Sequence, residues 1–146
     1  MKMKKTINDF HFKTFDKKDR SSFSYWYMHW KAFNLTAYFL GAWKFKYLFH
    51  DFEKPWLKLF WPYEKVQAFH RKHANHHVQY AGDDFDWEAM VIDWECSRFT
   101  KSAAQLNAAD TLVEEIKRLE PGTGKYQQTW LSDHVTPVLK KFGLIQ

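Results

Sequence analysis

Residues that interrupt helices are few and widely spaced in this chain. Its 146 residues include only five glycines and four prolines, fewer than the turns of a loop-rich β-sandwich normally use. Hydrophobic residues make up 45% of the composition, so a chain of this length can bury a core of its own. These features predict a compact all-α bundle that forms a single domain.

The few interruptions divide the chain into helical segments. Ser21 or Ser22 can cap a helix that runs to about residue 40, and Gly41 is placed to end it. We expect four further core helices and one or two short C-terminal helices separated near Pro137, over the ranges 42–52, 63–80, 85–104, 111–119 and 125–146. Pro55 and Pro62 bracket a connector.

We expect the single domain, 1–146, to have three parts. Residues 1–20 form an extended arm that packs over the core, residues 21–104 hold the candidate site, and residues 105–146 form the C-terminal helices. Seven tryptophans fall at helical or connector positions and are expected to pack in the core: Trp26, Trp30, Trp43, Trp56, Trp61, Trp87 and Trp94.

Charge is unevenly distributed along the chain. Residues 1–75 contain fifteen Lys and Arg against six Asp and Glu (+9), and residues 76–146 contain seven against eleven (−4), which together give the net charge of +5. A half of the chain with excess positive charge attracts the phosphates of nucleotides, nucleic acids or lipid head groups. A lysine-rich solvated surface explains the same pattern, so both interpretations stay open.

Cysteine usage and hydropathy point to the cytoplasm. Cys96 is the single cysteine, which rules out an intramolecular disulfide and a cysteine-based zinc site, and we expect it to be a small core residue. The longest nearly uncharged apolar stretch, residues 35–43, is too short to span a bilayer, and residues 1–5 lead into no apolar signal core. We therefore expect a cytoplasmic protein with no membrane partner. The sequence does not indicate its oligomeric state.

Two groups of residues that contain histidine are candidates for a metal site. One is the pair His50–Asp51, and the other is four histidines within eight positions, His70, His73, His76 and His77. Neutral imidazole is the commonest metal ligand in proteins, and a neighbouring carboxylate supplies an oxygen donor. The alternative is a solvated histidine-rich surface. We expect one or two divalent ions, and these ligands suit Mn, Fe, Co, Ni or Zn.

The order of these residues resembles the HD superfamily of metal-dependent phosphohydrolases, all-α proteins named for a His-Asp pair at the end of a helix. His29, the pair His50–Asp51 and Asp93 match in order the set that holds one metal there. Lys54 completes the motif His-Asp-x-x-Lys. More narrowly, the chain resembles a small, often phage-encoded family with that motif, a twin-histidine segment and an Asp-Trp pair, here Asp93–Trp94. The resemblance spans about residues 22–104.

The resemblance implies a phosphohydrolase that acts on a nucleotide or other small phosphorylated metabolite, in the host cytoplasm if the chain is phage-encoded. The expected metal ligands are His29, His50, Asp51, His73, His77 and Asp93. Asp51 and Lys54 are the expected catalytic residues, which orient water and meet the phosphate. The expected substrate contacts are Lys54, His70, Arg71, Lys72 and His76. The division of the four clustered histidines between metal and substrate stays open.

Two other functions fit the same residues. The same fold with two irons can perform oxygenase chemistry on substrates that carry phosphonate or hydroxyl groups. Alternatively, the protein is a catalytically silent binding module, and its basic N-terminal half docks nucleic acid, a nucleotide or a protein partner.

Overall fold

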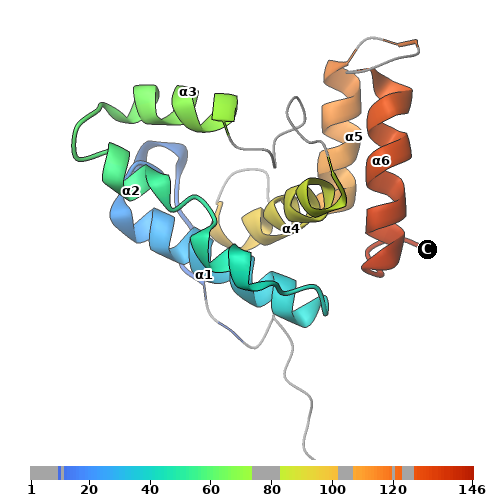
Figure 1. The fold of residues 1–146 in the computed structure, drawn as a ribbon, viewed down its shortest axis with the longest axis horizontal. Helices are drawn as coiled ribbons and strands as arrows, with labels where there is room; N and C mark the ends of the chain where they lie inside the picture. The colour runs from blue at the N-terminus through green and yellow to red at the C-terminus, as the bar shows by residue number, and fades with distance from the viewer. Residues whose placement is uncertain (1–9, 11, 74–82, 102–106, 120, 123–126) are drawn as a thin grey trace, which may run out of the picture.

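The computed structural model describes residues 10, 12–73, 83–101, 107–119, 121–122 and 127–146. Within these residues the fold is all-α, as predicted, and its one β contact is an isolated parallel bridge between Phe15 and Lys101. The helices are η2 (Lys17–Asp19), α1 (Phe23–Phe39), η3 (Phe45–Phe49), α2 (Glu53–Leu57), α3 (Tyr63–His73), α4 (Asp84–Thr100), α5 (Ala108–Arg118) and α6 (Gln128–Lys141), where η marks a 3-10 helix (Figure 1).

The first long helix begins and ends where the sequence predicts. The Ser22 hydroxyl accepts a hydrogen bond from the backbone N–H of Tyr25 at 3.1 Å and so caps α1. After the helix, Gly41 has a φ of +73°, a left-handed conformation that glycine adopts without steric cost. His29 and Phe33 lie on the buried face of α1.

The prediction of a helix over 42–52 is wrong. The chain forms the short η3 instead and then turns at Asp51, whose φ is +54°. A new helix, α2, starts at Glu53 and runs through Pro55, where the sequence predicted a connector. Proline is tolerated there because a backbone N–H in the first turn of a helix has no acceptor within the helix.

Two of the other helices, α4 and α5, begin at capping residues. Asp83 and Asp86 form a capping box at the start of α4, and Asn107 accepts from the backbone N–H of Asp110 at the start of α5. The predicted helix over 63–80 is described as far as His73, and residues 74–82 lie outside the described part. The prediction that two short helices are separated near Pro137 is wrong, because α6 continues through that residue.

Helix α4 lies between the two halves of the core (Figure 1). One cluster of buried side chains joins α4 to α5 and α6, and includes Met90, Leu112 and Leu131. The other joins α4 to α1 and η3, and includes Phe33 and Ile92. A helix packed on both sides holds its polar side chains at fixed positions, and one of them, Asp93, belongs to the site described below.

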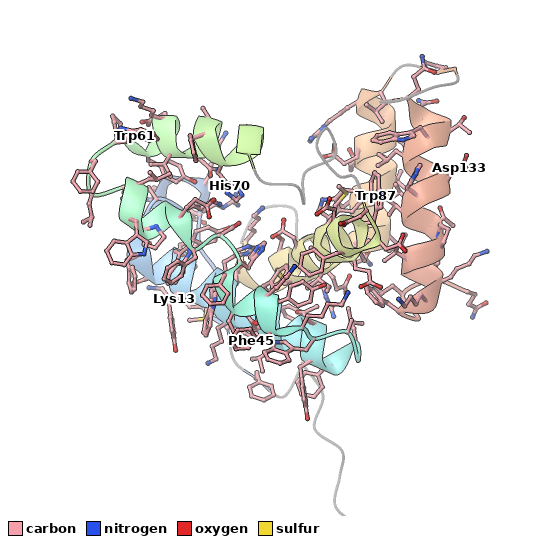
Figure 2. The ribbon with its side chains drawn as sticks, viewed as in Figure 1. Lys13, Phe45, Trp61, His70, Trp87 and Asp133 are labelled. Atoms are coloured by element: carbon pink, nitrogen blue, oxygen red, sulfur yellow. The ribbon has the colours of Figure 1, made fainter. Side chains whose placement is uncertain are left out.

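Two of the tryptophans expected in the core are on the surface. Trp87 is 4% exposed and lies between α4 and α6 (Figure 2), but Trp43 and Trp56 are 42% and 58% exposed. The indole N–H of Trp43 donates to Asn34 Oδ1 at 2.9 Å, and the Trp56 ring contacts Phe52. An amphipathic ring keeps an exposed edge at little cost when such partners lie at the surface.

In the described part of the N-terminal arm, Phe15 is the buried residue. Phe15 is 6% exposed, and its backbone N–H donates to the carbonyl of Thr100 at 2.8 Å. This bond ties the arm to the end of α4. None of the described helices has both the length and the apolar character required to cross a lipid bilayer.

Candidate metal centre

Three segments that are distant in the sequence bring the candidate ligands together. His29 comes from α1, His50 and Asp51 from the turn after η3, and Asp93 from α4. Because α1 and α4 pack against each other and η3 packs on α1, the four side chains meet in the middle of the fold. Three of the residues are at least 92% buried, and the Asp93 side chain is 19% exposed.

The facing atoms have the spacing of ligands around one small cation. His29 Nε2 lies 2.9 Å from Asp93 Oδ1 and 3.2 Å from His50 Nε2, and His50 Nε2 lies 3.2 Å from Asp93 Oδ1. Asp51 Oδ2 lies 3.6 Å from His29 Nε2 and 3.5 Å from His50 Nε2. Donors about 2.1 Å from a shared ion are separated by about 3.0 Å in octahedral and about 3.4 Å in tetrahedral geometry.

The electrostatics of the cluster also suit a cation. Burial lowers the pKa of His29 although Asp93 opposes the effect, so this ring is kept neutral, as a metal ligand must be. Burial also acts to lower the pKa of His50, but the carboxylates of Asp51 and Asp93 outweigh it and raise the pKa. Two carboxylates therefore favour positive charge between the rings. These buried groups can bind a metal ion.

Neighbouring rings hold the two imidazoles in place. The His50 ring stacks on Phe33 with centroids 3.7 Å apart and an angle of 7° between the planes. The Tyr25 ring stacks on His29 at 5.9 Å. The second ring nitrogen of His29, Nδ1, lies 3.8 Å from Cys96 Sγ. Aromatic packing thus fixes both rings with their Nε2 atoms directed at the carboxylates.

The cysteine remains a core residue, as predicted. Cys96 is fully buried, and its thiol donates to the carbonyl of Asp93 at 3.2 Å. Burial and the negative charge of Asp93 raise the pKa of this thiol well above its ordinary value. It therefore stays protonated and is no nucleophile.

A second group of donors lies on the other side of Asp51. His70 Nε2 is 3.1 Å from Asp51 Oδ1, and His70 Nδ1 contacts Glu53 Oε1. His70 is 2% exposed and faces inward from α3 (Figure 2). Asp51, Glu53 and His70 also have donor atoms close enough together to hold an ion. One carboxylate, Asp51, thus belongs to two candidate sites.

Lys54 places a positive charge beside the cluster. Its Nζ lies 3.0 Å from Asp51 Oδ2. Burial acts to lower the pKa of Lys54, but Asp51 and then Asp93 outweigh it and raise the pKa, so the ammonium stays charged. The side chain is 22% exposed and can be reached from solvent.

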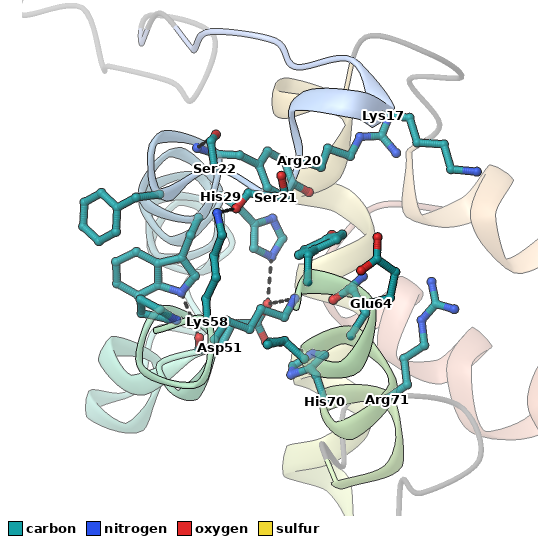
Figure 3. A pocket seen from close by; sticks show the side chains of 18 of the residues that line it. Lys17, Arg20, Ser21, Ser22, His29, Asp51, Lys58, Glu64, His70 and Arg71 are labelled. Atoms are coloured by element: carbon teal, nitrogen blue, oxygen red, sulfur yellow. Dashed lines mark hydrogen bonds and ion pairs between the residues drawn. The ribbon is translucent and has the colours of Figure 1, made fainter. Parts of the chain in front are cut away.

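Three residues of the cluster, His29, Asp51 and Asp93, line a cleft of about 960 Å³ (Figure 3). Side chains of α1, α2, α3 and α4 line it, together with residues of η2 and the segment that follows it. Its size is at the upper end of the range for small-molecule sites. Ligand access is therefore built into the fold at the position of the histidines and carboxylates.

The structure brings together His29, His50, Asp51 and Asp93 from the predicted ligand set, with Lys54 beside them. His70, predicted as a substrate contact, lies against Asp51 and Glu53, among groups that can hold a metal. Arg71 is exposed and lines the cleft. Four predicted residues have side chains outside the described part of the chain: Lys72, His73, His76 and His77.

The sequence interpretation missed several residues of the site. Glu53 could have been found as a carboxylate two positions after Asp51, and Tyr25 as the residue one turn before His29 on the same helical face. The basic residues Lys17, Lys18 and Arg20 also line the cleft. Their signal was a cluster of charge immediately before the helix cap.

The fold and the site together define an all-α chain with buried His and Asp residues that can bind metal at the base of a cleft. Comparison of the chain with protein-family models, with curated proteins and with solved structures gives no match.

Proposed function

We propose that this protein is a metal-dependent phosphohydrolase of the HD type that acts on a nucleotide or other small phosphorylated metabolite. The observation that carries the proposal is the meeting of His29, His50, Asp51 and Asp93, with donor atoms 2.9–3.6 Å apart, beside the charged Lys54 in an accessible cleft. The order of these residues along the chain supports the same superfamily.

The chemistry of the site supports phosphoryl transfer. A divalent ion held by the two histidines and two aspartates would act as a Lewis acid that makes water nucleophilic near neutral pH. Lys54 would offset charge that develops on the phosphoryl oxygens. Burial and the charge of Asp93 raise the pKa of Tyr25, which also lines the cleft, so its hydroxyl stays protonated and can donate to an anionic substrate.

Metal content of the untagged protein tests the centre directly. We expect close to one or two equivalents of a transition metal by elemental analysis of the wild type, and strong loss in Asp51→Ala, because that carboxylate faces both groups of donors. Asp133→Asn, which changes an exposed carboxylate on α6, is the matched control and keeps its metal. Less than about half an equivalent in wild type and Asp51→Ala alike contradicts the proposal.

Turnover tests the reaction class. Nucleotides and simple phosphate esters are incubated with the protein and Mn, Co, Ni or Fe, and release of phosphate or dephosphorylated product is measured. We expect Lys54→Gln to lower kcat by about a hundredfold, since one preorganised charge at the reacting group is lost. Activity that survives both Lys54→Gln and Asp93→Ala belongs to a contaminant and counts against the proposal.

The position of Asp51 between two groups of donors favours one second candidate. A carboxylate with Oδ2 toward His29 and His50 and Oδ1 toward His70 can bridge two ions. A di-iron oxygenase uses such a bridge as readily as a two-metal hydrolase does. A charge-transfer absorption band in the visible range, together with O₂ consumption on addition of substrate, would favour the oxygenase.

A further inference from the structure

Beyond Lys54, the cleft has more positive charge than a single phosphoryl group requires. Six other basic side chains line it: Lys17, Lys18, Arg20, Lys58, Arg71 and Lys101. Apart from Asp51 and Asp93 in the metal centre, the one carboxylate in the lining is Glu64. A cleft lined by one sign of charge concentrates the electrostatic potential and attracts ions of opposite charge.

These basic residues come from several elements that the fold holds around the same opening. In Figure 3 Lys17 and Arg20 lie at the top of the cleft and Arg71 at its lower right, and His29 and Asp51 lie to the left of them. The Phe15 backbone bond to Thr100 holds the segment before η2 against the end of α4. The basic rim, defined here as Lys17, Lys18, Arg20 and Lys101, is thus a built part of the fold.

Among the described residues, no carboxylate pairs with the charges of the rim. Within the described part of the chain, no ion pair joins any of the six basic residues to Asp or Glu. Lys58 donates to the backbone carbonyl of Ser21, and Arg20 Nε is buried with no hydrogen-bond partner among the described residues. Lys44 and Lys141, by contrast, both pair with Glu88. Buried guanidinium N–H groups normally have an acceptor, so an anion that enters the cleft can accept a hydrogen bond here.

We propose that the cleft takes a substrate with a chain of two or more phosphates, in which one phosphoryl group lies at the metal centre and the others reach outward to the basic rim. The inference rests on the proposed hydrolase for the inner phosphate, but the rim is a separate set of residues. Nucleoside di- and triphosphates, and linear inorganic polyphosphate, share this chemistry.

Calorimetric titration of the purified full-length chain tests the rim without requiring turnover. The probes are inorganic phosphate, pyrophosphate and tripolyphosphate, in excess magnesium to limit removal of a resident transition metal. We expect affinity to rise by about tenfold or more from phosphate to tripolyphosphate, and to fall with added salt, because each added phosphate meets further cations. Equal affinity for the three probes overturns the proposal.

Variants of the rim supply the second readout. Arg20→Gln and the double variant K17Q/K18Q are expected to weaken tripolyphosphate binding by about tenfold and to leave phosphate binding within twofold. The double variant changes exposed side chains, so it folds even if Arg20→Gln does not. Lys140→Gln removes the same charge from the exposed end of α6 and is the matched control. If Lys140→Gln weakens tripolyphosphate binding as much as the rim variants do, the effect comes from the net charge of the protein and not from the rim, and the proposal is overturned.

Two further results separate this inference from the proposed hydrolase. Metal binding and monophosphate hydrolysis, together with tripolyphosphate binding that is unchanged in the rim variants, would leave the hydrolase standing and overturn the polyphosphate site. Tripolyphosphate binding that depends on Arg20, in a protein without metal or turnover, would support the site and reject the hydrolase. Preference for a short single-stranded oligonucleotide over tripolyphosphate, lost in K17Q/K18Q, overturns the inference in favour of a nucleic-acid groove.

Discussion

Asp51 makes contacts in several directions at once. Its Oδ2 meets Lys54, its Oδ1 meets His70, and its carbonyl accepts a hydrogen bond from the indole of Trp26 at 2.8 Å. The backbone reaches this position through a φ of +54°, a left-handed conformation that Asp tolerates better than most residues. The same turn separates η3 from α2 and directs the carboxylate into the cluster.

The backbone at this residue can be tested apart from its carboxylate. We expect Asp51→Gly to be more stable than Asp51→Ala by about 1 kcal/mol in the free energy of unfolding, because alanine is strained at positive φ and glycine is not. Urea denaturation measures both. Each variant lacks the carboxylate, so each controls for the loss of that group in the other. Equal stabilities would show that the turn relaxes without cost.

At the scale of single elements, three helix starts agree with their sequence signals, and two prolines, Pro55 and Pro137, lie inside helices where the sequence predicted interruptions. Ser22, Asp83 and Asn107 each cap a helix through a local hydrogen bond, which is why neighbouring residues suffice to predict it. Pro137 was expected to separate two helices. It is exposed, but Val135 and Leu139 on either side of it are buried in the core, and their packing keeps α6 continuous.

Replacement of this proline is expected to stabilise α6. Proline at 137 has no N–H for the carbonyl four residues earlier, and its ring crowds that carbonyl. We expect Pro137→Ala to raise the free energy of unfolding by about 1 kcal/mol or more, measured by urea denaturation. Lys140→Ala, on the exposed face of the same helix, is expected to change it by less than about 0.5 kcal/mol. A loss of stability in Pro137→Ala would mean that the core is adapted to a bent helix.

At the scale of the whole molecule, Glu88 connects elements from both ends of the chain. It is a buried residue of α4 that accepts from Lys44, just before η3, at 2.9 Å, and from Lys141 at the end of α6. Burial acts to raise the pKa of Glu88, but the hydrogen bonds from Lys141 and Lys44 outweigh it and lower the pKa below its ordinary value of 4.5. The charged carboxylate therefore stabilises the assembled bundle.

This ion pair predicts a pH dependence with a definite sign. The unfolded chain takes up the proton first as the pH falls, so the stabilisation by Glu88 is complete above about pH 5.5 and is lost as the pH drops through the lowered pKa of the folded state. We expect Glu88→Gln to lose stability relative to wild type at pH 7, and the difference to shrink toward pH 3 in urea denaturation. Glu114→Gln, in an exposed pair with Lys117, is the control and changes little. A difference independent of pH would assign the effect to packing.

The helical class of the fold was predictable from sequence because it depends on short-range features. Caps, scarce glycine and proline, and apolar residues at helical spacing all act within a few positions of the chain. The order His29, His50–Asp51, Lys54 and Asp93 was visible for the same reason, as a pattern of residue types along the chain. The sequence by itself therefore determined the class of fold and the candidate ligands.

Only the tertiary structure decided which of these residues meet. Packing of α1 on α4 brings His29 to 2.9 Å from Asp93 across 64 positions of sequence, and the left-handed turn at Asp51 divides its two oxygens between His50 and His70. The basic rim depends in the same way on the bond between Phe15 and Thr100. These contacts come from the burial of side chains that are distant in the chain, and no local pattern encodes that geometry.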